Sequence, residues 1–342
     1  MSSATPDVRE EVEKVVQRKV PNVRDAPVLV FVSDLHLGSP PLARTAESSW
    51  NEVQVRYLTQ LLDRTMVRFP GDDKVRGGIR SWTPLVIGGD IWDKWKQPPG
   101  MINLIIQQFR RFHRVYAIPG QHDLPYHEYD SRHQSAYWTL VEAGVVHDLE
   151  PGYNVDLTDR NVALWAYPWG NLIKRPKPDD HKNWLRVCVA HRYVWKNAHR
   201  YEGAPNRQSV ERMYDKLHGY DVALFGDNHM GWLDAETGCT IVNNGTFMRR
   251  KMDERHYKPR CHLVYADGRV EPSYFDVEDD KFLDLGAQGI VVADAAEAKK
   301  WMRSLEELAD QGLNFEEAVV KMLDKERVSK AVRKLTLHCL GK

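Results

Sequence analysis

Five short polar segments of this 342-residue chain carry side chains that could hold metal ions. In chain order they are Asp34-Leu35-His36, Gly89-Asp90, Gly120-Gln121-His122-Asp123, Ala190-His191 and Gly226-Asp227-Asn228-His229. Carboxylates suit hard divalent cations, and imidazole suits manganese, iron or zinc. The mixed set therefore favours a manganese-type site over an all-thiolate structural site, and metal-assisted hydrolysis is the chemistry that it could support.

Each polar segment follows an apolar run that predicts a buried parallel strand, because the runs are short, continuous and rich in β-branched residues. The runs cover residues 28–32, 84–87, 115–118, 187–189 and 222–225. Open α/β sheets bind their ligands at the carboxyl ends of strands. We therefore expect the five segments to meet in one site although they lie far apart in the chain.

The segments between these runs predict α/β architecture. Helical patterns at about 43–69, 101–112 and 206–217 alternate with the strands, as in βαβ units. Residues 149–169 instead predict strands joined by tight turns, and hence a second, partly antiparallel sheet. Together these patterns predict a four-layer αββα sandwich, with two sheets inside and helices outside.

Changes in sequence character suggest three parts. We expect a catalytic domain at 1–250 that begins with an amphipathic helix at 7–20. A charged segment and a β-hairpin at 251–290 would add to the sheet, and a small helical domain would follow at 291–342. The apolar stripes of that last part have the spacing of helix core positions, so we assign them no chemistry.

Composition limits the classes of partner and compartment. Lys plus Arg equal Asp plus Glu at 48 each, so binding to nucleic acid would depend on local basic patches rather than on net charge. The four cysteines form no CxxC pair, which favours reduced thiols over a disulfide framework or a zinc ribbon. The sequence contains no signal-peptide pattern and no long apolar stretch. We therefore expect a cytoplasmic protein that does not contact membranes.

The five segments also carry a resemblance. The ordered motifs D-x-H, G-D-x-x-D, G-N-H-D, H and G-H-x-H are those of calcineurin-like metallophosphoesterases, and this chain reads DLH, GDIWD, GQHD, AH and GDNH over about residues 28–250. The resemblance implies two divalent metal ions, expected to be Mn²⁺, with Mg²⁺, Fe²⁺ and Zn²⁺ as alternatives. It implies the following ligands: Asp34, His36 and His229 on the first metal, Asp90 on both, and Gln121, His191 and Asp227 on the second.

The same resemblance implies a mechanism. A hydroxide that bridges two metals roughly 3.5–4 Å apart would attack phosphorus in line. His122 would bind no metal, would face the leaving group, and would stabilise the transition state or protonate the departing oxygen. Asp123 would orient His122 and raise its basicity, and Asp93 would support a metal ligand from outside the coordination sphere.

Two positions depart from the family pattern. Gln121 stands where the family has Asn, so a longer side chain must bend back to bring its carbonyl oxygen to the metal. Asp227 stands where the family has His, which replaces a neutral nitrogen by an anionic oxygen. With Asp34 and Asp90 this gives three carboxylates, and we expect the second position to favour manganese or magnesium over zinc. Tighter binding of zinc there, in a competition titration, would contradict this expectation.

A second resemblance concerns the substrate. Residues 243–250 are similar to a segment of SbcD-like DNA repair exonucleases of phages and bacteria, with Asn244 in place of a proline. It implies a manganese-dependent nuclease that acts on DNA, with an SbcC-like ATPase partner docked on the C-terminal helices. Arg249, Arg250 and Lys251 are candidate contacts to nucleic acid. Trp92 and Trp95 could either stack on a base or pack in the core.

Two other functions stay open at this stage. The same metals could serve a phosphomonoesterase or a small-molecule phosphodiesterase, of the protein phosphatase or cyclic nucleotide type. The chain could also be a metal-binding scaffold without turnover, although His122 argues against this. The sequence does not decide between exonuclease and endonuclease, the polarity of cleavage, or whether the chain forms a homodimer.

Overall fold

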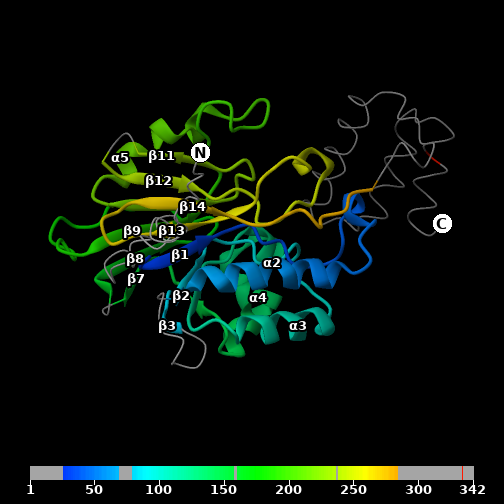
Figure 1. The fold of residues 1–342 in the computed structure, drawn as a ribbon. Coiled ribbons are helices and arrows are strands. Elements are labelled where there is room, and N and C mark those ends of the chain that lie inside the picture. The colour runs from blue at the N-terminus through cyan, green and yellow to red at the C-terminus, as the bar shows by residue number, and fades with distance from the viewer. Residues whose placement is uncertain (1–25, 69–78, 158–159, 236–237, 284–332, 334–342) are drawn as a thin grey trace, which may run out of the picture. The chain divides into compact units, whose positions relative to one another are not determined.

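The computed structural model describes residues 26–68, 79–157, 160–235, 238–283 and 333 (Figure 1). The chain divides into two compact units, Met1–Leu283 and Asp284–Lys342, and all described residues except 333 belong to the first. The helix predicted at 7–20 lies outside the described residues, and so does the predicted domain at 291–342 apart from residue 333. The predicted domain boundaries therefore stay predictions.

The first sheet has six strands in the order β14-β13-β1-β4-β5-β6. Strands β1, β4, β5 and β6 run parallel to one another, whereas β13 and β14 form a hairpin whose first strand pairs antiparallel with β1. The predicted hairpin is thus an extension of this sheet. The bounds are β1 Leu29–Val32, β4 Leu85–Ile87, β5 Val115–Ala117, β6 His147–Asp148, β13 Arg260–Val264 and β14 Val270–Tyr274.

The second sheet has the order β11-β12-β10-β9-β8-β7. Strands β8, β9, β10 and β12 are parallel, and the edge strands β7 and β11 are antiparallel to their neighbours. This confirms the predicted partly antiparallel second sheet. The bounds are β7 Gly152–Leu157, β8 Val162–Tyr167, β9 Leu185–His191, β10 Val222–Gly226, β11 Trp232–Asp234 and β12 Thr240–Asn243. A small separate sheet pairs β2 Met66–Arg68 with β3 Ile79–Trp82.

Helices α2 Trp50–Thr65, α3 Pro99–Phe109 and α4 Ala136–Glu142 lie together on one side of the sheets, and α5 Tyr214–Leu217 lies on the other (Figure 1). Helix α2 begins where the Ser49 side chain accepts a hydrogen bond from the Glu52 N–H, as an N-cap does. Short 3₁₀ segments occur at Leu42–Arg44, Gln121–Asp123, Pro125–His127, Tyr129–Gln134, Asn206–Gln208, Val210–Arg212 and Met252–Glu254.

The helix predicted at 206–217 is wrong in part. Two 3₁₀ segments occupy half of it, and only Tyr214–Leu217 is α-helical. The reason is a tertiary contact, because the N–H groups of Trp195 and Val210 bond to the carbonyls of Gln208 and Trp195. These bonds take backbone groups that a continuous helix would need for itself.

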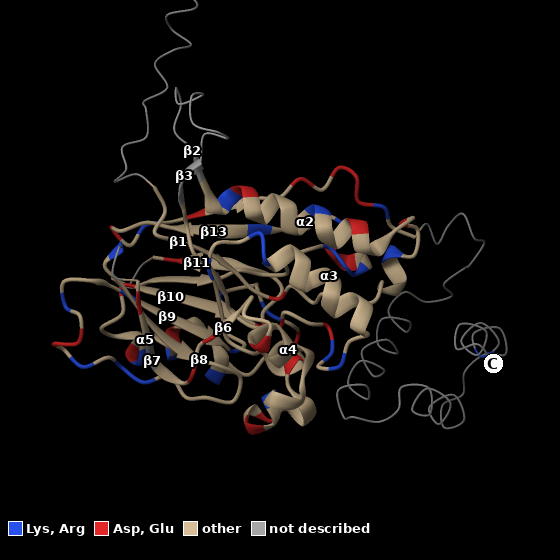
Figure 2. Ribbon diagram, turned by 90° about the horizontal axis from the view of Figure 1, so that it is seen from below, with Lys and Arg blue, Asp and Glu red and all other residues tan. Residues whose placement is uncertain are grey.

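Three apolar clusters separate the layers. One lies between the first sheet and its helices, one between the two sheets, and one on the outer face of the second sheet. Charged residues occur along α2, while the residues of the central strands are mainly uncharged (Figure 2). The molecule is therefore the predicted α/β sandwich. Trp92 is fully buried in the first cluster, which decides in favour of core packing for that residue.

Cys188, Cys239 and Cys261 are buried free thiols, and Cys339 lies outside the described residues. Among the residues that the structure describes, none of the helices has the length and apolar character needed to cross a membrane.

Candidate metal centre

The loops after β1, β4 and β10 are joined by hydrogen bonds that hold the candidate ligands in register. The N–H of Asp34 bonds to the carbonyl of Gly89 and the N–H of His36 to that of Asp90, both at 3.0 Å. The N–H of Asp227 lies 3.0 Å from Asp34 Oδ1. Because β1 and β4 belong to one sheet and β10 to the other, the site lies where the carboxyl ends of both sheets meet.

Three groups of ligand atoms converge there, each within 4.8 Å. They are Asp34, His36 and His229; Asp34, Asp90 and His191; and His36, Asp90 and His122. The structure thus brings together five of the seven predicted ligands directly, together with His122. Asp227 is not in these groups, but its Oδ1 accepts a hydrogen bond of 2.8 Å from the amide nitrogen of Gln121.

Four of the predicted ligands have left-handed backbone conformations, which non-glycine residues rarely adopt. Their φ angles are 55° at Asp34, 45° at His36, 53° at Asp90 and 79° at Asp227. Each such residue costs about 1–3 kcal/mol, and such strain concentrates at functional sites. Asp34, His36 and Asp90 also belong to the groups of converging ligand atoms, so the strain lies at the candidate site.

His36 and His229 face each other with their Nε2 atoms 3.1 Å apart. Burial lowers the pKa of both imidazoles, and that of His229 falls to about 3. Both rings are therefore neutral near pH 7, and each neutral ring has one nitrogen with a free lone pair. Two lone-pair nitrogens at this distance suit a shared cation.

His191 has its tautomer fixed by the backbone. Its Nδ1 lies 2.6 Å from the Gly88 carbonyl, so Nδ1 carries the proton and Nε2 is left as a potential ligand. That Nε2 lies 3.4 Å from Asp90 Oδ2. Although burial opposes it, the Asp90 carboxylate raises the pKa of His191. A metal ion held by His191 Nε2 and Asp90 would take the place of the proton that Nε2 binds when His191 is charged.

Buried polar atoms without a hydrogen-bond partner mark the same point. Among the described residues these include Asp90 Oδ2, His191 Nε2, Gln121 Oε1 and His36 Nδ1. Buried polar groups in native proteins are nearly always satisfied. An oxygen of Asp90, a nitrogen of His191 and an amide oxygen of Gln121 that lack partners at one centre fit a divalent metal ion.

The buried carboxylates also fit a metal centre, because the pKa values of two of them are raised. Burial, with Asp90 and Asp227 nearby, raises the pKa of Asp34 to about 7. Burial also raises the pKa of Asp227. Several buried carboxylates that share one centre need positive charge to stay ionised together. The residues present therefore fit a pair of cations.

The calcineurin-like phosphoesterase family matches residues 27–231, more than half of the chain. The chain belongs to this family. Members typically bind two divalent metals, in agreement with the groups of ligand atoms above. No curated protein gives a significant match.

The solved structures that are similar to this phosphoesterase include three named proteins. An archaeal phosphodiesterase is 10% identical, with 72% of this chain and 99% of that chain covered and a TM-score of 0.34. A phosphopantetheinyl hydrolase from Mycobacterium tuberculosis is 14% identical, with coverages of 74% and 98% and a TM-score of 0.40. A putative 5'-nucleotidase from Staphylococcus aureus is 12% identical, with coverages of 76% and 56% and a TM-score of 0.40. These values are too low to bear on the substrate of this chain.

In this phosphoesterase His122 is partly buried at the outer side of the centre. Its N–H bonds to Asp90 Oδ1 at 2.9 Å, and its Nδ1 lies 3.0 Å from the carbonyl of Asp93. With Nδ1 held by this carbonyl, Nε2 is the ring nitrogen that could pass a proton to a leaving group.

The role predicted for Asp123 is wrong with respect to orienting His122. The Asp123 carboxylate is fully buried and accepts hydrogen bonds from the N–H groups of Ile91, Trp92 and Gly120. Backbone donors thus engage its oxygens, and the Asp93 carbonyl faces His122 instead. Asp123 therefore joins the loops after β4 and β5, and so acts on the position of the Asp90 segment.

Asp93 lies beside His36, one of the predicted metal ligands. Its Oδ1 is 4.0 Å from His36 Nδ1 and 2.7 Å from the Arg250 guanidinium. Arg250 thus contacts a carboxylate that borders the centre.

Glu254 is a residue that the sequence did not reveal. Its Oε1 lies 4.0 Å from His229 Nδ1, and its other oxygen accepts the N–H groups of Arg250 and Lys251. It sits in a charged segment that fits no motif, so only the folded loop brings it to the site.

The three basic residues predicted to contact nucleic acid lie in different environments. Arg249 is 9% exposed and bonds through its guanidinium to Asp280 and two backbone carbonyls. Arg250 pairs with Asp93, whereas Lys251 is exposed. Arg249 therefore has a structural role, and Lys251 is the exposed member of the three.

Proposed function

We propose that this phosphoesterase is a two-metal-dependent phosphodiester hydrolase that cleaves DNA. The observation that carries the proposal is a buried cluster of carboxylates and imidazoles with unpartnered atoms, beside which His122 and His229 reach the surface. The side chain of His229 is 33% exposed. A phosphate at the surface of the unit could therefore reach the centre without being enclosed.

The ligands divide between two positions. Asp34, His36 and His229 would hold one cation, His191 with Gln121 and Asp227 would hold the other, and Asp90 would contribute to both. When bound, such cations activate an attacking water and neutralise charge on the phosphoryl oxygens. The chain's own residues add orientation and a proton: Asp93 holds the His122 ring through its carbonyl, and His122 Nε2 would protonate the departing oxygen.

The neighbouring loop supports a polyanionic substrate. Residues 249–260 contain six Lys or Arg against two acidic residues. Arg249 and Arg250 pair with acidic residues outside this segment, whereas Lys251, Arg255 and Lys258 are exposed. Such a local excess of positive charge favours contacts to a phosphate backbone. The proposal also includes an ATPase partner of the coiled-coil type and a homodimer of this chain, and binding experiments would test both.

The test is hydrolysis by protein that has been stripped with EDTA and then reloaded with Mn²⁺. End-labelled single- and double-stranded DNA would be compared with a small phosphomonoester and a small phosphodiester. We expect DNA to be degraded, Asp90→Asn to abolish the reaction, and the exposed Asp179→Asn to serve as the matched control with unchanged rates.

Other outcomes would redirect the assignment. Turnover of a small ester without cleavage of DNA would replace the nuclease by a phosphomonoesterase or a small-molecule phosphodiesterase. Stoichiometric Mn²⁺ binding without turnover of any of these substrates would indicate a metal-binding scaffold.

A further inference from the structure

A pocket of about 580 Å³ begins directly beside the metal centre. Its lining includes Met230 and Gly231, the two residues that follow the candidate ligand His229. Successive Cα atoms are about 3.8 Å apart, so the inner end of the pocket is within about 8 Å of the His229 backbone. This volume is in the range of pockets that hold small ligands. We call it the Arg260 pocket, after the residue on which the argument rests.

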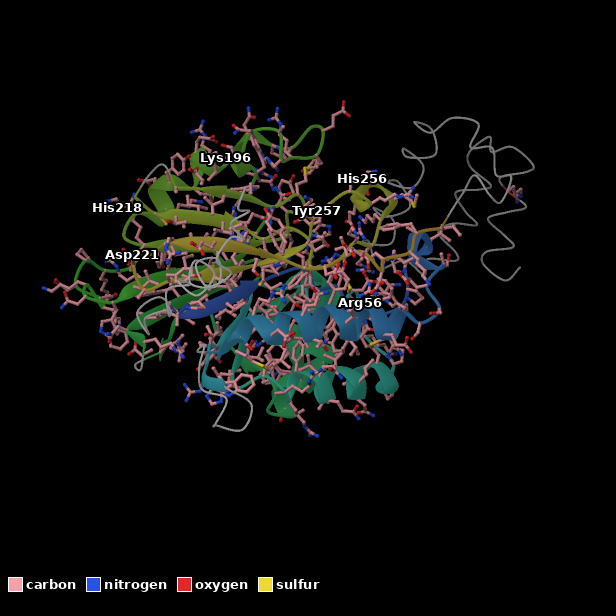
Figure 3. The ribbon with its side chains drawn as sticks, in the orientation of Figure 1. Arg56, Lys196, His218, Asp221, His256 and Tyr257 are labelled. Atoms are coloured by element: carbon pink, nitrogen blue, oxygen red, sulfur yellow. The ribbon has the colours of Figure 1, made fainter. Side chains whose placement is uncertain are left out.

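The Arg260 pocket is positively charged. Lys196, Lys258 and Arg260 line it together with two histidines, and none of the lining residues is acidic. Lys196 is held by the buried carboxylate of Asp234 at 3.2 Å. Figure 3 shows Lys196 on a different loop from His256 and Tyr257, so separate parts of the chain supply the pocket.

Arg260 has no carboxylate partner within ion-pair distance in the part of the chain that the structure describes. Its guanidinium carbon lies 5.9 Å from the Tyr257 ring centre and 5.7 Å from that of Tyr274. Its Nη1 donates a long hydrogen bond of 3.4 Å to the Tyr274 hydroxyl, and its Nε is buried without a hydrogen-bond partner. Arg260 is therefore held in place by these two tyrosines while its charge stays unneutralised, which suits binding of a phosphate.

The pocket also offers apolar surface. Tyr274 is 47% exposed and Met230 is 43% exposed, both at the pocket lining. The Tyr257 hydroxyl donates to the Asn244 carbonyl at 3.2 Å, which fixes the Tyr257 ring against the loop next to the metal centre. A ligand that matches these features carries both an anionic phosphate and a planar ring.

We propose that the Arg260 pocket binds the nucleotide that adjoins the scissile phosphodiester, with Arg260 on its phosphate and its base against Tyr274 and Met230. The inference rests on the proposed function, since it concerns the same substrate. It assigns to Arg260, Lys258 and Tyr274 a share in substrate binding outside the metal centre. Bases stack on aromatic side chains without strong sequence preference, so the pocket would accept any base.

The experiment measures binding without catalysis. Fluorescence anisotropy of a labelled tetrathymidylate would be recorded with metal-free protein in EDTA. Relative to wild type, we expect Arg260→Gln to weaken binding about tenfold and Arg260→Lys to have an intermediate effect, because lysine keeps the charge but loses the fork. The matched control is Arg269→Gln at the turn between β13 and β14, where Arg269 is exposed and pairs with Glu271 and Asp267. An abasic tetranucleotide should bind wild type at least threefold more weakly than the tetrathymidylate.

Several outcomes would overturn the inference. It falls if wild type does not bind the tetranucleotide, if Arg260→Gln and Arg269→Gln weaken binding equally, or if the abasic ligand binds as well as the complete one. If Arg260→Gln does not fold, the exposed Lys258→Gln is judged by the same criterion, with an expected weakening of at least threefold. Cleavage of DNA with unaltered binding by these variants would remove this proposal alone. Binding through Arg260 without cleavage would remove only the proposed nuclease function.

Discussion

Arg44 and Asp280 form an ion pair of 2.8 Å in which both side chains are fully buried, although 236 residues separate them. The same carboxylate accepts hydrogen bonds from Arg56, Tyr57 and Arg249, and Figure 3 labels Arg56 on α2. Asp280 therefore ties the end of the described unit to α2 and to the loop that follows β12. Arg249 is also the neighbour of Arg250, which contacts Asp93 at the metal centre.

Replacing Asp280 should destabilise the unit. Asp280→Asn leaves three arginines without their shared anion, and loss of one partner of a buried ion pair costs about 3–5 kcal/mol. We expect a loss of this order in urea unfolding. The matched control is Asp279→Asn, because the Asp279 side chain is 81% exposed and should change stability by less than about 0.5 kcal/mol. Equal effects of the two substitutions would contradict the importance of the cluster.

The same carboxylate predicts a pH dependence. Although burial opposes it, hydrogen bonds from Arg44 and Tyr57 lower the pKa of Asp280 below its ordinary value. A lowered folded-state pKa stabilises the protein fully above the unfolded value of about 3.9, and this stabilisation is lost as the pH falls through the folded-state pKa. The stability difference between wild type and Asp280→Asn should thus be constant from about pH 5 to pH 8 and shrink in acid. A difference that grows below pH 4 would refute this.

His122 should matter according to the leaving group. Because Nε2 would protonate the departing oxygen, His122→Gln should lower kcat by about 10²-fold or more for an alkoxide leaving group. The loss should be smaller for p-nitrophenolate, which leaves without a proton. Steady-state kinetics on the two esters, with bound metal measured by elemental analysis, checks this. An equal loss with both esters would mean that His122 acts otherwise, for example as a metal ligand with His36 and Asp90.

Gln121 should support the second metal position. Its amide nitrogen donates to Asp227, which leaves Oε1 buried, unpartnered and available to a cation. Gln121→Ala should weaken binding of the second Mn²⁺ about tenfold or more and leave the first little changed. Isothermal titration with Mn²⁺ separates the two steps. A variant that binds both ions like wild type would show that water fills this position.

Metal ions should stabilise the fold. A ligand present at a hundred times its Kd adds about 2.7 kcal/mol to the free energy of unfolding. Mn²⁺ should therefore raise the Tm of the EDTA-treated protein, and Asp90→Asn should lose most of that rise because Asp90 is the ligand that both positions are expected to share. Differential scanning calorimetry with and without Mn²⁺ measures both. An equal rise in wild type and variant would place the ions elsewhere.

The strands and the polar residues at their ends could be predicted from the sequence because both depend on local patterns. Short β-branched runs gave β1, β4, β5, β9 and β10, and the polar residues after them converge because strand ends share an edge. The sequence predicted one shared site, whereas the division of its residues between two sheets became apparent only in the structure.

What could not be predicted depends on contacts across long separations. Backbone hydrogen bonds to Trp195 decide the conformation of residues 206–217, and hydrophobic periodicity does not reveal such a partner. Asp123 looked like a partner for His122 because it is adjacent in sequence, but adjacent residues rarely face the same way in a turn. Arg249 and Lys251 are two residues apart and similar in charge, yet only the position of Asp280 decides that the first is buried.

The place of β1 in its sheet has a consequence for how the protein is made. This strand, which leads to Asp34 and His36, lies between β4 and β13, and β13 is translated after all the other strands of the two sheets except β14. Such non-local pairing slows folding and leaves an unpaired edge exposed meanwhile. When the residues up to β12 have emerged from the ribosome, the nascent chain contains every candidate metal ligand. It still lacks β13, the strand that pairs with β1 in the first sheet. Synthesis of the hairpin is thus the step at which the metal centre should acquire its native affinity.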